Sequence, residues 1–244
     1  MADYPKLIGH RGAAEYAPEN TLAGLNAAAG IGLNWAQVNV KLSRDGIPLL
    51  LHDDTLERTT SGSGDVAETD WADIRELDAG SWFGESFIGE PVPTLDSALE
   101  RALDLNLNLN IDIVPSEDRD METAEAVLDH ITRIWDEPQR IILSSFSMTV
   151  LEVCAEMVPD WKRTWNLAPD FAAYWQEMAG HLKPAAIHVG AATAQPDFVH
   201  QILRSGYALL TGPVNEVSAA QNFLEMGVHG FISDMPDILY EAFE

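Results

Sequence analysis

The feature that most constrains the fold is a regular alternation of short apolar runs with longer amphipathic segments along the chain. Eight runs have the length and composition of strands, and each is followed by a segment with helical spacing. The runs are 6–10, 36–42, 107–114, 140–146, 162–167, 185–190, 207–212 and 230–234; the helical segments are 21–30, 94–105, 117–136, 147–157, 169–181, 194–205, 216–227 and 235–243. Eight strand-then-helix units in a chain of 244 residues predict a closed (β/α)8 barrel, the TIM-barrel fold.

One segment interrupts this alternation after the second strand. Residues 46–54 have the pattern of a hairpin partner for that strand, because Asp45-Gly46 is a turn signal. The stretch that follows is rich in glycine, serine, threonine and tryptophan. We predict a single domain over residues 1–244, with an insertion at about 53–93 packed over the C-terminal mouth of the barrel.

Composition excludes several classes of partner. Lysine and arginine total 14 against 39 aspartate and glutamate residues, which gives a formal net charge of −25. A surface of that sign repels nucleic acid and anionic membranes, so we expect neither as a partner. The single cysteine, Cys154, excludes an internal disulfide and a cysteine-based zinc site. The chain shows no apolar stretch typical of a signal peptide or a membrane span, and a soluble cytoplasmic protein is expected.

Polar residues at the ends of the predicted strands are the candidates for chemistry. In a barrel of parallel strands, catalytic and binding groups lie at the C-terminal ends of the strands. The polar residues there are His10, Arg11, Gln37, Asn39, Asp112, Ser144, Ser145, His188, Asn215, Ser233 and Asp234. A lone histidine at a strand end is more often structural than functional, so His188 by itself is a weak indication of a site.

Several of these residues stand in short motifs. The motifs are HRG at 10–12, PENT at 18–21, HD at 52–53, RTT at 58–60, GSW at 80–82, NIDI at 110–113, SSF at 144–146, VN at 214–215 and ISD at 232–234. Together they resemble the glycerophosphodiester phosphodiesterase family over nearly the whole chain. The resemblance implies a barrel with a small insertion that hydrolyses a glycerophosphodiester to glycerol 3-phosphate and an alcohol. It also implies a divalent metal cofactor, commonly Mg²⁺ or Ca²⁺, and a small-molecule glycerophosphodiester or phosphate ester as the partner.

The resemblance assigns roles to particular residues. His10 and His52 match the two acid/base histidines, and a histidine near neutral pKa can take a proton from one oxygen and give it to another. Arg11 matches the phosphate-binding arginine, whose fork fits two phosphate oxygens. Glu19 and Asn20 match the polar pair of the PENT motif, which we assign to substrate or phosphate binding.

The chain departs from the family pattern where the metal ligands are expected. The family has Glu-x-Asp where this chain has Gln37 and Asn39, and Glu-x-Lys where it has Asp112 and Val114. Of the three candidate metal ligands Gln37, Asn39 and Asp112, only Asp112 keeps its charge. Because ligand charge tunes the affinity for hard cations over orders of magnitude, the metal site is expected to be weak or absent. A buried amide pair bonded to its neighbours is an equally open interpretation.

Three hypotheses follow for the function. The chain is a working phosphodiesterase with weakened activity or an altered metal demand; or it is a non-catalytic barrel that binds a phosphodiester or phosphate ester between Arg11 and the histidines; or it keeps only the fold, as a scaffold. A serine-hydrolase mechanism is excluded because the sequence has no G-x-S-x-G motif. The sequence favours the phosphodiester site and leaves turnover open.

Overall fold

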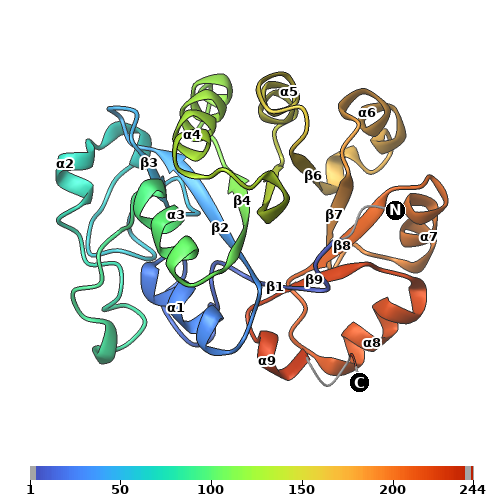
Figure 1. The fold of residues 1–244 in the computed structure, drawn as a ribbon, viewed down its shortest axis with the longest axis horizontal. Helices are drawn as coiled ribbons and strands as arrows, with labels where there is room; N and C mark the ends of the chain where they lie inside the picture. The colour runs from blue at the N-terminus through green and yellow to red at the C-terminus, as the bar shows by residue number, and fades with distance from the viewer. Residues whose placement is uncertain (1–3, 240–242, 244) are drawn as a thin grey trace.

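Eight parallel strands close into a barrel in the computed structural model, which describes residues 4–239 and 243 (Figure 1). Each strand pairs with the next in the chain, and β1 pairs with both β9 and β2, which closes the ring. The barrel strands are β1 (Leu7–Gly9), β2 (Trp35–Leu42), β4 (Asn108–Ile113), β5 (Ile141–Ser145), β6 (Lys162–Leu167), β7 (Ala186–Gly190), β8 (Ala208–Gly212) and β9 (Gly230–Ser233). The predicted (β/α)8 barrel is confirmed.

Helices follow the barrel strands and surround them on the outside (Figure 1). They are α1 (Leu22–Gly30), α3 (Leu95–Asp104), α4 (Asp120–Ile134), α5 (Met148–Met157), α6 (Trp175–Leu182), α7 (Pro196–Arg204), α8 (Val217–Met226) and α9 (Pro236–Leu239). Hydroxyl side chains begin three of them: Thr21, Thr94 and Ser147 accept hydrogen bonds from the first turn of α1, α3 and α5. No helix among the described residues is long and apolar enough to cross a membrane.

Two predicted helices differ from the structure in extent. The segment 169–181 divides into a short 3₁₀ turn, η4 (Pro169–Phe171), and α6, because Pro169 begins a turn of its own. The last helix was predicted over 235–243, and α9 (Pro236–Leu239) lies in the described part of that range. The part of that prediction at 240–242 lies outside the described residues.

The barrel interior is apolar at one level and polar above it. Ile8, Ile142, Ala186, Ala208, Leu210 and Ile232 form an apolar cluster with Tyr4. Along β2 and β4, Val38 and Ile111 belong to the main core, whereas the alternate residues Gln37, Asn39 and Asp112 are buried polar groups. Successive side chains of a strand point to opposite faces, so these polar groups face the barrel axis. The strands therefore bring a polar layer to one end of the barrel.

The segment after β2 forms an antiparallel strand and then the insertion. Strand β3 (Pro48–Leu50) pairs with β2, as the turn signal predicts, and the insertion contains η1 (Val66–Glu68), α2 (Trp71–Ile74) and η2 (Glu85–Phe87). Seven buried residues give this region its own small core: Leu49, Leu51, Leu56, Val66, Ile74, Ala79 and Val92. In Figure 1 it lies on the side of β2 and β3. The assignment of residues 1–244 to one domain with an insertion at 53–93 stays a prediction.

Candidate active site

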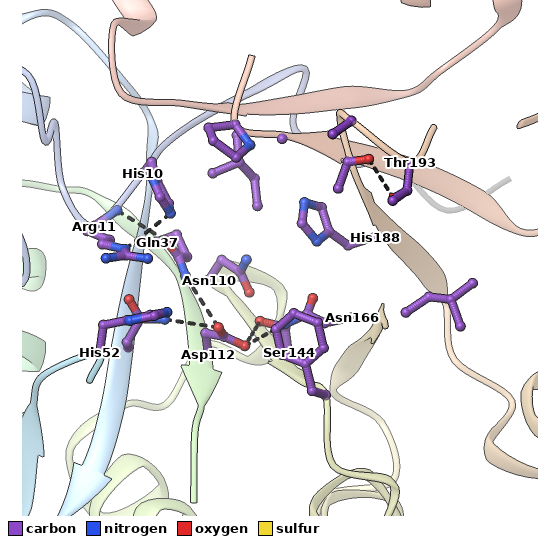
Figure 2. Close-up of a pocket in the computed structure, with 18 of the residues that line it drawn as sticks. His10, Arg11, Gln37, His52, Asn110, Asp112, Ser144, Asn166, His188 and Thr193 are labelled. Atoms are coloured by element: carbon purple, nitrogen blue, oxygen red, sulfur yellow. Dashed lines mark hydrogen bonds between the residues drawn. The ribbon is translucent and has the colours of Figure 1, made fainter. Parts of the chain in front are cut away.

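A cavity of about 390 Å³ opens at the C-terminal ends of the barrel strands (Figure 2). Its polar lining consists of His10, Arg11, Gln37, Asn39, His52, Asn110, Asp112, Ser144, Asn166, His188 and Thr193, and apolar groups such as Phe146, Leu167, Pro213 and Ile232 complete it. Eight residues singled out from the sequence thus line one cavity: His10, Arg11, Gln37, Asn39, His52, Asp112, Ser144 and His188. Among the described residues of the insertion, none lines it; His52 stands just before the insertion begins.

His10 follows β1 and is held by a carboxylate. Its Nδ1 lies 2.6 Å from Oδ1 of Asp234, and Asn215 donates to Oδ2 of the same carboxylate at 2.8 Å. Burial raises the pKa of Asp234, but the hydrogen bond from His10 and its charge outweigh burial, so the pKa is lowered. A carboxylate at Nδ1 favours the tautomer with its proton there. The Nε2 lone pair then accepts a hydrogen bond from Arg11 Nε at 3.2 Å.

His52 has the same kind of support from a different part of the chain. Its Nδ1 lies 2.7 Å from Oδ1 of Asp53, and Arg58 donates to Asp53 through Nε at 2.5 Å and Nη2 at 2.8 Å. These hydrogen bonds from Arg58 hold the pKa of Asp53 well below its ordinary value. Burial lowers the pKa of His52, so this imidazole is neutral at neutral pH and can accept a proton.

The backbone at Arg11 is held in an uncommon conformation. Arg11 has φ of +52°, a left-handed value that side chains other than glycine rarely adopt and that is concentrated at functional sites. Its N–H donates to Gln37 Oε1 at 3.1 Å, and its carbonyl accepts from Asn20 N–H at 3.0 Å. Gly12 follows with φ of +99°, and a Cβ there would lie 2.6 Å from the carbonyl carbon of Gly24 in α1. The HRG motif is therefore a turn pressed against the first helix.

Glu19 and Asn20 lie behind the cavity rather than in it. Glu19 accepts from Arg11 Nη1 at 2.6 Å and from Arg58 Nη1 at 2.8 Å. Burial raises the pKa of Glu19, but the hydrogen bonds from Arg58 and Arg11 outweigh it, so the carboxylate is charged and would repel phosphate. Asn20 is buried, and both ends of its amide bond to Asn39. In the structure this pair contacts Arg11, Arg58 and Asn39 and does not line the cavity; its predicted contact with phosphate stays a prediction.

The amides at the predicted metal positions have a fixed orientation. The backbone N–H of Arg11 can only donate, so Gln37 presents Oε1 to it and turns its NH₂ group to Asp112. The backbone N–H of Asn39 donates to Asn20 Oδ1 at 2.9 Å, which leaves the Asn20 NH₂ group to donate to Asn39 Oδ1 at 3.1 Å. The Asn39 NH₂ group therefore also faces Asp112, at 3.0 Å from Oδ2.

Asp112 collects hydrogen bonds from both sides. Besides the two amides, Ser144 donates to Oδ1 at 3.0 Å and Asn166 at 2.7 Å (Figure 2). Burial raises the pKa of Asp112 to about 6, and the hydrogen bonds from Ser144, Asn166 and Asn39 oppose the rise. At neutral pH the carboxylate is therefore charged and is surrounded by donors that carry no net charge.

This arrangement does not fit a divalent cation. Mg²⁺ and Ca²⁺ bind oxygen atoms, and both amide oxygens already accept hydrogen bonds while both NH₂ groups point at the only carboxylate. Among the described residues, no group of three or more histidine, cysteine, aspartate or glutamate side chains that could hold a metal occurs. The predicted ligand positions Gln37, Asn39 and Asp112 are together in space, as a hydrogen-bonded network.

Some residues of the site were not singled out from the sequence. Asn166 donates to Asp112, and Arg58 supports both Asp53 and Glu19, although Arg58 stands in the quoted RTT motif. The signal for Asn166 is its place near the end of a barrel strand. Asp234 was a strand-end candidate without a role, and the structure brings it to His10.

Comparisons with known proteins agree with the motifs. The defining pattern of the Glycerophosphoryl diester phosphodiesterase family matches residues 10–238. The chain is 30% identical to a glycerophosphodiester phosphodiesterase of Caldanaerobacter subterraneus subsp. tengcongensis, over 96% of this chain and 95% of that protein. A phosphodiesterase of Oleispira antarctica, solved in complex with the product sn-glycerol-3-phosphate, has a TM-score of 0.93 and 34% identity, covering 98% of this chain and 96% of that one.

A further solved structure shares the fold and the length. A glycerophosphodiester phosphodiesterase from Agrobacterium tumefaciens has a TM-score of 0.80 and 25% identity, over 98% of this chain and 100% of that chain. The family match begins at His10 and takes in every residue that lines the cavity. With a family match over residues 10–238 and a relative 30% identical over 96% of this chain, the chain belongs to the glycerophosphoryl diester phosphodiesterase family.

Proposed function

We propose that this protein hydrolyses glycerophosphodiesters to glycerol 3-phosphate and an alcohol, with His10 and His52 transferring protons and Arg11 binding the phosphate. The observation that carries the proposal is that these three side chains line one cavity, and that a carboxylate holds Nδ1 of each histidine. Hydrolysis of a phosphodiester needs a base for the attacking oxygen and an acid for the leaving oxygen. Two oriented histidines can supply both.

The two histidines differ in a way that suggests their order of action. Burial keeps His52 neutral, which suits the group that accepts a proton from the attacking hydroxyl or water. His10 is the other histidine of the cavity, so we assign it the donation of a proton to the leaving oxygen, with Asp234 orienting its ring. Glu19 and Asn20 act as positioning residues in this proposal, because they fix Arg11 and the amide network.

The rate is expected to be low and independent of Mg²⁺ and Ca²⁺. The family generally uses a divalent metal, and the amide network of this chain leaves no set of oxygen atoms for one. Losing preorganised stabilisation of charge in the transition state costs about 10²–10³ in rate. The proton-transfer pair remains, so the activity is weakened rather than absent.

A second candidate function is binding of a phosphodiester or phosphate ester without turnover. The observation in its favour is that the hydrogen-bond donors around Asp112 satisfy the carboxylate without any cation. Such a network has no remaining role in polarising a phosphate. The cavity would then hold its ligand through Arg11 and the histidines.

Hydrolysis assays separate these possibilities. Glycerophosphocholine and bis(p-nitrophenyl) phosphate are offered with EDTA and, separately, with Mg²⁺, Ca²⁺ or Mn²⁺. Slow turnover that EDTA does not change supports the proposed hydrolase. No turnover, together with stoichiometric binding of glycerol 3-phosphate, supports the binding barrel, and the absence of both supports a scaffold.

Arg58→Ala is a matched control for the role of Arg11. Both arginines bind Glu19, but only Arg11 lines the cavity. Calorimetric titration of glycerol 3-phosphate should show binding that Arg11→Ala weakens by about tenfold or more, because a charge-assisted contact with phosphate is lost. Arg58→Ala should stay within a few-fold of the parent protein. An equal loss in both variants would show that Arg11 acts only through Glu19.

A further inference from the structure

Two polar side chains of the cavity have atoms that the rest of the protein leaves without a partner. Asn110 extends from β4 and His188 from β7, and Figure 2 shows both reaching into the space beyond Asp112 and Asn166. Among the described residues, Asn110 Oδ1 and His188 Nε2 are buried and have no hydrogen-bond partner. Buried polar atoms are nearly always paired, so such a pair at one cavity indicates that its partner is a molecule in the cavity.

The amide network does not explain these two residues. Asp112 takes its hydrogen bonds from Gln37, Asn39, Ser144 and Asn166, and the network is complete without Asn110 or His188. The strand next to His188 carries an apolar residue at the same level, since His188 pairs in register with Leu210. On the other side His188 pairs in register with Asn166, whose NH₂ group donates to Asp112, so neither neighbouring strand supplies His188 Nε2 with a partner.

The chemistry of the pair restricts its ligand. Burial, with a smaller contribution from the charge of His10, lowers the pKa of His188 to about 4, so its imidazole is neutral. With the Asn110 amide oriented as in the structure, Oδ1 needs a donor, which neither an ionised phosphate oxygen nor a quaternary ammonium group supplies. A hydroxyl group both donates and accepts, so it can pair with Asn110 Oδ1 and with His188 Nε2 in either tautomer.

The surroundings strengthen this preference. Leu167, Pro213 and Ile232 line the same cavity, and in apolar surroundings a hydrogen bond is stronger and an unpaired polar atom costs more. A ligand that lacks hydroxyls would bury Asn110 Oδ1 and His188 Nε2 without replacing their partners. Sites built in this way reject the analogue that lacks the hydroxyl.

We propose that Asn110 and His188 form a polyol subsite, which binds the hydroxyl groups of the glycerol half of the substrate while Arg11 binds its phosphate. The assignment rests on the proposed function, because it takes Arg11 and the histidines as the phosphate side of the cavity. Asn110 and His188 are specificity-determining residues here. They select an ester of a polyol over an ester of a simple alcohol, and they carry no proton in the reaction.

Two ligands with the same three-carbon skeleton test the subsite. Calorimetry compares glycerol 3-phosphate with n-propyl phosphate, which lacks both hydroxyls. The parent protein should prefer glycerol 3-phosphate by about tenfold or more. Asn110→Leu and His188→Leu should bring the ratio of the two affinities close to one by weakening only glycerol 3-phosphate. His188→Gln, which keeps a polar group of similar reach, should retain part of the preference.

Several outcomes would overturn the subsite. The subsite is wrong if both leucine variants keep the full preference for glycerol 3-phosphate over n-propyl phosphate. It is also wrong if they lose affinity for both ligands equally, because that indicates damage to the whole cavity. Circular dichroism and thermal unfolding check that the variants fold; if Asn110→Leu does not, His188→Leu decides, because β8 already carries a leucine at the paired position.

The failure of the subsite is separable from the failure of the proposed function. Hydrolysis of bis(p-nitrophenyl) phosphate by the parent protein tests the hydrolase without the subsite, because this substrate has no hydroxyl group. Turnover of that substrate with no preference for glycerol 3-phosphate refutes the subsite and leaves the hydrolase intact. A preference that depends on His188, without any turnover, leaves the subsite intact and refutes the hydrolase. A parent protein that binds neither phosphate ester refutes both.

Discussion

Two walls of the same cavity are built on different principles. On the histidine wall, formed by His10, Arg11 and His52, each cationic or basic group is held by a carboxylate: Asp234, Glu19 and Asp53. On the amide wall, formed by Gln37, Asn39 and Asp112, one carboxylate is surrounded by donors without net charge. The two histidines of the first wall can gain or lose a proton. On the amide wall, the hydrogen-bonding groups pair with one another. The histidine wall thus holds the groups that the proposed function uses for proton transfer, and the amide wall has hydrogen-bonded amides at the predicted metal positions.

The largest effect is expected on the histidine wall. His10→Ala and His52→Ala should each lower kcat/KM for glycerophosphocholine by about 10²–10⁴, because proton transfer to or from the reacting oxygens is lost. His130→Ala is the matched control, since His130 Nδ1 lies 2.5 Å from Asp96 Oδ1 in the same kind of pair, outside the cavity. Full activity in His10→Ala would remove the histidine wall from the mechanism.

Rebuilding the amide wall should produce the next largest effect. The quadruple variant Gln37→Glu, Asn39→Asp, Asp112→Glu, Val114→Lys restores the ligand charges and a cation for the phosphate. Its turnover of glycerophosphodiesters should rise by about 10²-fold, and only with Mg²⁺ or Ca²⁺ present. The single changes should give little, because residues that act as a unit are not additive.

His10→Ala in the quadruple background should abolish that gain, because the metal-dependent activity still requires proton transfer by His10. If the parent protein already turns over glycerophosphodiesters as fast as the quadruple variant, the interpretation that its activity is weakened by the amides is wrong. A quadruple variant that folds but stays inert favours the non-catalytic binding barrel.

A single return to a carboxylate should destabilise the fold. Asn39→Asp places a second buried carboxylate 3.0 Å from Asp112 Oδ2, where the parent has an NH₂ donor. At pH 8 both groups are charged, and the expected loss of unfolding free energy is about 2–4 kcal/mol. At pH 5 one carboxyl can be protonated and donate, so the loss shrinks.

Urea unfolding of the variant and the parent at the two pH values measures this effect. Asn215→Asp is the comparison on the histidine wall, where the new carboxylate meets Asp234 next to His10 in a half-buried position, and it should cost less. Equal losses at pH 5 and pH 8 would mean that charge repulsion is not the cause.

The smallest effect concerns the pH dependence of stability. The pKa of Asp112 is about 6 in the folded protein, against about 3.9 in an unfolded chain. Between about pH 4 and pH 6, Asp112 is protonated in the folded state and ionised in the unfolded state. Protonation of Asp112 therefore stabilises the fold fully below about pH 4, and this stabilisation is lost as the pH rises through about 6. Asp112→Asn cannot titrate, and its unfolding free energy relative to the parent should rise by about 2 kcal/mol from pH 4 to pH 7. A difference that stays constant across this range would contradict a raised pKa.

The sequence allowed the barrel and the contents of its mouth to be predicted for a physical reason. The alternation that marks strands and helices is local, and parallel strands bring distant ends such as His10, Gln37 and Asp112 to one place. The position of Glu19 and Asn20 was not predictable in the same way. Asn20 has φ of +56°, and a motif does not show which side of such a turn faces the cavity.

The hydrogen-bond partners of the amide side chains could be identified only from the structure. Asn166 reaches Asp112 across two strand positions of the barrel, because β5 lies between β4 and β6. Which side chains meet across strands depends on the stagger of the closed barrel, and no single segment encodes that stagger. The substitutions at Gln37 and Asn39 could be read from the sequence, whereas the direction of their hydrogen bonds depends on the N–H groups of Arg11 and Asn39.

The direction of these hydrogen bonds has a consequence for the history of such a chain. Donors lead from two backbone N–H groups through Gln37, Asn20 and Asn39 and end on Asp112. A lineage that returns one amide to a carboxylate loses a donor and sets two buried anions together, before enough ligands exist to attract a cation. The predicted destabilisation of Asn39→Asp means that this first step lowers stability before any cation can compensate for it. A return to a carboxylate site therefore requires several changes together, even in surroundings rich in magnesium.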